Sequence, residues 1–210
     1  AGRDCPSPGL EAAADWIAKR FEAAGLKPGG KDGSFRRVYE LPGQRLDSTK
    51  LAVSGWSYGG YMTSNIVTRT GRFKAAVAGA GPVNLAAQAG TSDIPGLMRA
   101  SMSAWPWEDP QVYLENSPLF RAGSVTTPTA FIHGEMDVRV NPAESLNMYR
   151  ALRARGVPTD LMTLPREGHG PSEPAHARAV MEWAQAWLER WTLGATPSTT
   201  ARKATTGGFK

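Results

Sequence analysis

Residues 51–62 read LAVSGWSYGGYM, and this stretch decides the fold. The run Leu51–Gly55 is short, apolar and ends in glycine, which predicts a buried strand. From Gly59 to Thr70 the apolar residues recur at helical spacing and predict a helix. Ser57 stands between the two, and residues 55–59 match the G-x-S-x-G pattern of a nucleophile elbow. The stretch therefore indicates a serine carried on a sharp strand-to-helix turn.

The glycines of this turn are expected to have a steric role. Gly55 and Gly59 would leave room where neighbouring chains crowd the turn, and Gly60 extends the small surface. The helix that begins here would direct its free N–H groups at developing negative charge. We expect the backbone N–H of Tyr58 to be one donor of an oxyanion hole.

The rest of the chain alternates short apolar strands with amphipathic helices. Further strands are predicted over residues 73–79, 128–134 and 159–164, and helices over 142–155 and 173–191. Residues 83–125 are mixed, because prolines interrupt their helical stretches. Buried strands that alternate with helices indicate a parallel sheet with helices on both faces, so the predicted fold class is α/β.

Two polar residues follow the third and fourth predicted strands. Asp137 lies in the segment HGEMDVRV (133–140), and His169 lies in PREGHG (165–170). Both loops leave the carboxyl ends of parallel strands, the edge at which such sheets bind ligands. With Ser57 they give the order Ser, Asp, His that this architecture uses. We predict that His169 takes the proton of Ser57 and that Asp137 fixes the imidazole tautomer.

Other residues near these loops have competing interpretations. Glu135 is the substitute acid if the loop is arranged differently. His133 precedes its loop within a strand, which favours a buried structural histidine, and His176 is expected on the exposed side of the last helix. The three histidines and the lone Cys5 show no pair at zinc-ligand spacing, so neither a metal nor another cofactor is predicted.

Composition limits the classes of protein. The chain has 210 residues, of which 41% are hydrophobic and 20% charged, and this fits a globular domain. The net charge of +5 comes from the termini, because residues 51–195 carry equal numbers of acidic and basic side chains. No basic cluster indicates nucleic acid binding, and no apolar run approaches the ~18 residues of a membrane span. With no signal peptide visible at Ala1, the cytoplasm is slightly favoured.

Several stretches resemble the C-terminal catalytic domain of the prolyl oligopeptidase family of serine peptidases. They are RLDSTKLAVSGWSYGGYM (45–62), RFKAAVAG (72–79), GTSDIP (90–95), PWEDPQVYLENSP (106–118), TPTAFIHGEMDVRV (127–140) and PREGHG (165–170). The resemblance implies an α/β-hydrolase fold and cleavage of short peptides through an acyl-enzyme. It implies Ser57 as the nucleophile, Asp137 as the orienting acid and His169 as the base. Tyr58 and Trp56 are then expected at the oxyanion hole and substrate pocket.

The chain also departs from that family. Members usually carry a β-propeller and further strands before the elbow, and the fold expected here lacks both. The strand at 51–53 would then have an uncovered edge, which invites pairing with another copy of the chain. Residues 1–41 resemble, more weakly, the N-terminal helix of bacterial zinc aminopeptidases. The expected domains are an N-terminal helix and linker (1–44), a catalytic core (45–194) and a disordered basic tail (195–210).

Three functions are compatible with these features. The first is a serine hydrolase that cleaves short peptides, and the second is a carboxylesterase that uses the same three residues. The third is a non-catalytic or poorly folded fragment that self-associates through its sheet edge. The expected partners are small peptide or ester substrates and, through that edge, a second copy of the chain, but neither nucleic acid nor membrane.

Overall fold

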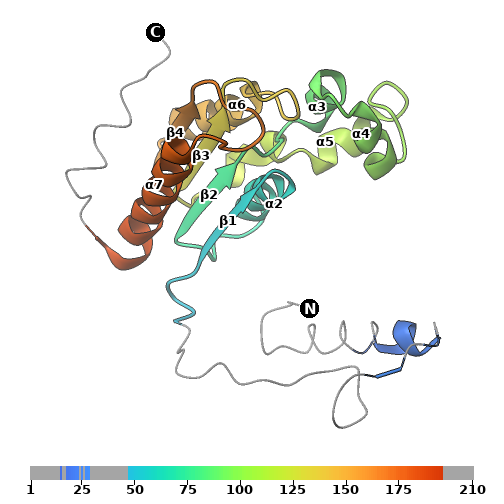
Figure 1. Ribbon diagram of the computed structural model, residues 1–210, viewed down its shortest axis with the longest axis horizontal. Coiled ribbons are helices and arrows are strands. Elements are labelled where there is room, and N and C mark those ends of the chain that lie inside the picture. The colour runs from blue at the N-terminus through green and yellow to red at the C-terminus, as the bar shows by residue number, and fades with distance from the viewer. Residues whose placement is uncertain (1–14, 16–17, 24, 26, 29–46, 196–210) are drawn as a thin grey trace. The chain divides into compact units, whose positions relative to one another are not determined.

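The computed structural model describes residues 15, 18–23, 25, 27–28 and 47–195 (Figure 1). The chain divides into two compact units, residues 1–46 and 47–210. In the first unit, Asp15 and residues 18–23 are helical. Most of the segment that resembles zinc aminopeptidases, and almost all of the tail expected after residue 194, lie outside the described residues, so those expectations stay predictions.

The second unit alternates strands and helices as predicted. Its elements are β1 (Ala52–Trp56), α2 (Tyr58–Val67), β2 (Ala75–Gly79), α3 (Leu85–Thr91), α4 (Pro95–Met102), α5 (Pro110–Asn116), the 3-10 helix η1 (Pro118–Ser124), β3 (Thr129–Gly134), α6 (Ala143–Ala154), β4 (Thr159–Leu164) and α7 (Pro174–Leu193). Most of the predicted boundaries differ from these by one or two residues, because helix and strand ends are set by caps and contacts as well as by periodicity.

The four strands form one parallel sheet in the order β1-β2-β3-β4. Ala52 pairs with Ala75 at the start of β1 and β2, and Thr129 pairs with Thr159 at the start of β3 and β4. Parallel neighbours require crossover connections, which the intervening helices supply. The predicted α/β class is therefore confirmed.

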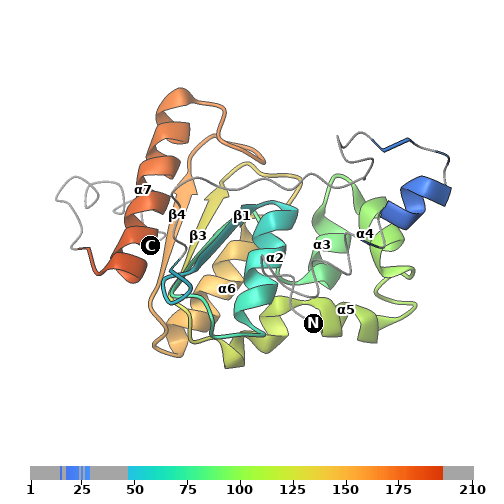
Figure 2. The same ribbon diagram turned by 90° about the horizontal axis from the view of Figure 1, so that it is seen from below.

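Helices cover both faces of this sheet (Figures 1 and 2). On one face, α7 packs Trp183 and Trp187 against small and branched residues of β2, β3 and β4. On the other face lie α2, α6 and η1. The tryptophan stripe of α7 is thus a packing surface, as expected of a helix on a sheet.

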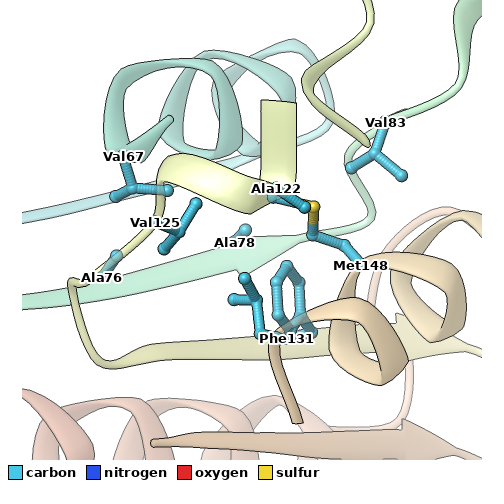
Figure 3. Close-up of a cluster of buried hydrophobic side chains, with 9 residues drawn as sticks. Val67, Ala76, Ala78, Val83, Ala122, Val125, Phe131 and Met148 are labelled. Carbon is cyan, nitrogen blue, oxygen red and sulfur yellow. The ribbon is translucent and has the colours of Figure 1, made fainter. Parts of the chain in front are cut away.

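The core beneath α2 and α6 combines large and very small side chains (Figure 3). Val67 of α2, Met148 of α6 and Phe131 of β3 converge on β2, which contributes Ala76 and Ala78. The alanines leave the volume that the larger side chains fill, and close packing of this kind makes each buried methylene matter. This core fixes β1 and α2, and therefore the turn between them.

Among residues 47–195 both edge strands of the sheet are unpaired on one side, since β1 has β2 as its only neighbouring strand and β4 has β3; the edge at β1 is the one for which pairing was predicted. The exposed residues Ala52 and Ser54 lie on this edge. Self-association through the edge stays a prediction. Among the described helices, none combines the length and apolar character needed to cross a bilayer.

Candidate active site

Ser57 lies between the end of β1 and the first residue of α2, Tyr58. Its φ of 59° and ψ of −118° are a conformation that costs an L residue about 1–3 kcal/mol. A serine at a helix N-cap usually accepts an N–H of the first turn through Oγ, but Ser57 makes no such bond. Its backbone N–H donates to Gly79 O at 2.8 Å, which holds the turn. The Oγ is therefore free to interact outside the helix.

The glycines around this turn differ in how closely they are packed. A Cβ on Gly55 would lie 2.5 Å from the carbonyl carbon of Gly59, and a Cβ on Gly60 would overlap Gly79 O. A Cβ on Gly59 would have no neighbour within 4 Å. The crowding predicted for Gly55 is therefore confirmed, and the same prediction for Gly59 is wrong, because its missing side chain would point into open space.

His169 follows β4 and joins Ser57 to Asp137. Its Nε2 lies 2.6 Å from Ser57 Oγ, and its Nδ1 lies 2.8 Å from Asp137 Oδ2. The His169 side chain is 29% exposed, whereas the Asp137 side chain is fully buried. Three residues from three separate loops thus form one continuous line of hydrogen bonds that ends at the protein surface.

The Asp137 carboxylate is surrounded by N–H donors. Its Oδ1 accepts from the backbone N–H groups of Arg139 and Val140, both at 2.9 Å. Its Oδ2 accepts from His169 and lies 3.3 Å from Nε2 of His133. Burial by itself raises the pKa of Asp137, but hydrogen bonds from His133, Val140 and His169 outweigh it and hold that pKa at about 2.

The protonation pattern of His169 follows from its partners. An ionised carboxylate can only accept hydrogen bonds, so Nδ1 of His169 carries the proton that faces Asp137. In a neutral imidazole the other nitrogen is then bare, and Nε2 accepts the hydroxyl proton of Ser57. This is the state in which a histidine can remove a proton from a serine.

Backbone hydrogen bonds connect the loop of Asp137 to the loop of His169. Met136 N–H donates to Glu167 O at 2.9 Å, and Glu135 N–H donates to Leu164 O at 3.0 Å. A Cβ on Gly134 would overlap the carbonyl oxygen of Gly168, so the two loops touch there. The loops that carry Asp137 and His169 are therefore held against each other.

Glu167 belongs to the loop of His169, is fully buried and holds this loop by hydrogen bonds. Its Oε2 accepts from Ser172 N–H at 2.8 Å and from the Ser172 hydroxyl at 2.7 Å. Its Oε1 lies 2.8 Å from Glu173 N and 2.8 Å from His176 Nδ1. The hydrogen bonds from Ser172 hold the pKa of Glu167 at about 2, although burial raises it.

The ligand atoms of Glu167, Glu173 and His176 lie within 4.8 Å of one another, as a metal site requires. Both oxygens of Glu167 are already occupied by hydrogen bonds, and Glu173 is paired with Arg166 at 2.9 Å. We therefore assign no metal to this cluster. Its donors instead satisfy a buried carboxylate, as buried charges require.

The remaining predicted residues have well-defined positions. Tyr58 begins α2, where backbone N–H groups lack acceptors within the helix, and its side chain is 68% exposed. The Trp56 ring lies against Gly79, and its indole N–H donates to His169 O at 2.6 Å. Glu135 is exposed, and Asp137 is the acid that contacts His169. The structure thus brings Trp56 to the loop of His169.

The two other histidines differ from each other. His133 is buried in β3, as its position in a strand predicted. The prediction that His176 lies on the exposed side of its helix is wrong: 20% of its side chain is exposed, because it packs onto Glu167. Periodicity places a residue on a helix face, but the loop folded over that face decides its exposure.

Glu167 and Ser145 have structural roles at the site that sequence patterns did not indicate. Glu167 stands two residues before His169, and Ser145 bonds to His133 from α6. The one feature of the sequence that could have indicated this role is the acidic side chain of Glu167 in the short glycine-containing loop PREGHG (165–170). Nothing in the local sequence pointed to Ser145.

Comparison with known proteins adds independent information. The model of the prolyl oligopeptidase family matches residues 41–195. Uncharacterized peptidase YuxL of Bacillus subtilis is 36% identical over 149 residues, covering 69% of this chain and 23% of YuxL. Acylamino-acid-releasing enzyme 1 of Oryza sativa is 32% identical over 140 residues, covering 61% of this chain and 18% of the enzyme.

A solved structure shows the same fold. Pyrococcus horikoshii acylaminoacyl peptidase superposes with a TM-score of 0.69 at 26% identity, covering 75% of this chain and 26% of that protein. The chain therefore spans about a quarter or less of the length of these relatives.

Proposed function

Since the chain belongs to the prolyl oligopeptidase family, we propose that its residues 45–194 form the catalytic core of a serine peptidase that cleaves short peptides through an acyl-enzyme. The observation that carries the proposal is the line of hydrogen bonds from Ser57 Oγ through His169 to Asp137. Three separate loops, each following a strand, bring these side chains together with matching donors and acceptors. A chance cluster of polar residues is not expected to have this arrangement.

In the proposed reaction, Ser57 Oγ attacks the carbonyl carbon of the scissile bond while its proton passes to His169 Nε2. Asp137 stabilises the imidazolium that forms and keeps its Nδ1–H directed inward. His169 then donates the proton to the leaving amine, which departs and leaves an ester on Ser57. A water molecule, deprotonated by His169, hydrolyses that ester and regenerates the serine.

We assign the backbone N–H of Tyr58 to the oxyanion hole. Tyr58 is the first residue of α2, so its N–H has no acceptor within the helix and lies beside Ser57. The helix dipole favours negative charge at this end. One donor of this type typically contributes a factor of about 100–1000 to the rate.

The names of the relatives suggest a class of substrate to test. The rice and Pyrococcus relatives bear names that describe removal of acylated amino acids. We propose peptides with a blocked or acylated N-terminus as the first substrates to test, as arylamides of N-acetylated amino acids. Trp56, whose indole N–H holds the backbone of His169, would position the base rather than contact substrate.

Labelling with a fluorophosphonate tests the nucleophile directly. We expect one adduct, mapped by peptide sequencing to Ser57, and no adduct in Ser57→Ala. Ser64→Ala is the matched control, because Ser64 is a buried serine in α2, remote from the line of hydrogen bonds. A folded protein that gains no adduct on Ser57 would refute the proposal.

Paired p-nitroanilide and p-nitrophenyl ester substrates then separate a peptidase from an esterase. Hydrolysis of both, lost together in Ser57→Ala, supports the peptidase. Hydrolysis of the ester alone supports a carboxylesterase that uses the same residues, because activated esters need less stabilisation of the transition state than amides.

A further inference from the structure

His133 is a buried histidine to which the reaction above assigns no role. It belongs to β3, and its side chain is 1% exposed. Its Nδ1 lies 2.6 Å from Ser145 Oγ, and its Nε2 lies 2.8 Å from Val140 O and 3.3 Å from Asp137 Oδ2. Every polar atom of the ring therefore has a partner.

These partners determine which nitrogen carries the proton. A carbonyl oxygen only accepts hydrogen bonds, so the Nε2 that faces Val140 O must carry a hydrogen. In the neutral ring Nδ1 is then bare, and it accepts the hydroxyl hydrogen of Ser145. Val140 O thus selects the Nε2–H tautomer, which directs an N–H toward the carboxylate of Asp137, and the Ser145 hydroxyl satisfies the bare Nδ1.

We propose that His133 is a positioning residue for Asp137, whose Oδ2 it holds in place by an Nε2–H shared between that oxygen and Val140 O. Asp137 then has four N–H donors, two on each oxygen, and only one of them belongs to His169. With its oxygens held on both sides, the carboxylate cannot rotate away from His169. The inference rests on the proposed function, because it assigns a role within that same site.

Two further charged groups belong to the surroundings of His133. Glu144 of α6 is buried next to Ser145, and burial raises its pKa. Glu144 is itself held by Val83 N–H at 2.7 Å and Asn84 N–H at 2.6 Å. Glu135 lines a cavity of about 440 Å³ that also borders His133, together with apolar side chains of α6 and β4.

Two variants of similar length separate a donor from a space-filling role. His133→Gln retains an N–H donor close to the position of Nε2, whereas His133→Met fills comparable space without one. We expect kcat/KM to fall about ten- to a hundredfold in the Met variant, mainly through kcat, since a hydrogen bond to a charged group is lost. The Gln variant should retain most of the activity.

The pH profile gives a readout that simple loss of packing would not change. Without the His133 donor, more negative charge remains on Asp137 Oδ2, which favours the protonated form of His169. The acidic limb of the kcat/KM profile should move to higher pH in His133→Met and stay in place in His133→Gln.

If the Met variant does not fold, rescue of a smaller variant by added imidazole tests the same inference. His133→Ala opens the vacated space to the adjoining cavity, and added imidazole can then occupy it. With an anilide substrate, which imidazole does not hydrolyse appreciably, we expect imidazole to restore part of the lost kcat. Rescue that fails in a folded His133→Ala protein contradicts the inference.

Nitrogen NMR of isotope-labelled histidine tests the inference without any activity. The chain has three histidines, so single substitutions assign each signal. Above neutral pH we expect His133 in the Nε2–H form, and the Nδ1–H proton of His169 should shift in His133→Met but little in His133→Gln.

The outcomes for the two proposals are distinct. An unreactive Ser57 refutes the proposed function, and the NMR experiment then still tests the contact between His133 and Asp137. An active wild-type protein whose Gln and Met variants behave alike, or an Nδ1–H form of His133, overturns the positioning role and leaves the proposed function intact.

Discussion

Gly55→Ala and Gly59→Ala test whether the turn at Ser57 depends on close backbone contact or only on flexible residues. Both glycines belong to the same five-residue motif, but a Cβ on Gly55 would lie 2.5 Å from the carbonyl carbon of Gly59. A Cβ on Gly59 would lie in open space. The two substitutions add the same methyl group and should have opposite effects.

The magnitudes follow from these distances. Ordinary contact of a Cβ begins at 3.4 Å, so β1 and α2 would have to separate by about 0.9 Å to accommodate alanine at position 55. Overpacking of this size costs about 1–3 kcal/mol, or about 2–4 °C in Tm for each kcal/mol in a domain of this size. Gly59→Ala removes a glycine from a helix, which stabilises by up to about 1 kcal/mol.

Thermal unfolding by calorimetry, without substrate, measures both effects. We expect Tm to fall in Gly55→Ala and to be unchanged or higher in Gly59→Ala. The rate of fluorophosphonate labelling should also fall in Gly55→Ala, because the separation displaces Ser57. Equal Tm values for the two variants, or a larger loss in Gly59→Ala, would refute the packing argument.

Three further predictions concern the supports of the site. The folded-state pKa of Glu167 is about 2, below its ordinary value of 4.5. The ionised carboxylate therefore contributes to stability above about pH 4.5, and this contribution is lost as the pH falls toward 2. Melting curves measured across this range should show that dependence in the wild type and much less of it in Glu167→Gln. Glu144→Ala leaves the N–H groups of Val83 and Asn84 without their acceptor, which should lower the free energy of unfolding by about 1–3 kcal/mol for each group. The control Glu182→Ala breaks an exposed ion pair and should lower it by less than about 1 kcal/mol. Urea unfolding measures both values. Gly79→Ala would push its Cβ into the Trp56 ring and so displace the loop of His169, which should slow fluorophosphonate labelling of Ser57. The control Gly90→Ala, whose Cβ would have no neighbouring atom within 4 Å, should be labelled at the wild-type rate.

The strands and the turn that carries Ser57 are predictable from sequence because their signals are local. A strand, a turn serine and a following helix occupy consecutive residues, so the motif around Ser57 can be recognised from local sequence, although β1 is only partly buried where its apolar run predicted a buried strand. The order of Asp137 and His169 after later strands then follows from the rule that parallel strands end at one sheet edge. These steps need no knowledge of which side chains touch.

Contacts between distant residues are decided by the tertiary structure alone. His133, His169 and His176 are the same residue type, and periodicity gave the wrong exposure for His176. Local sequence could not show that Glu167 gathers donors from Ser172, Glu173 and His176, because the loop must first fold over α7.

The glycines illustrate the same division. Local sequence patterns are sufficient to predict an α/β sheet with a serine on a strand-to-helix turn. The crowding of Gly55, the open space at Gly59 and the 3.3 Å approach of His133 Nε2 to Asp137 Oδ2 emerge from the folded structure. These distances depend on which elements and loops pack against one another, and a local pattern carries no information about partners that lie far away in the sequence.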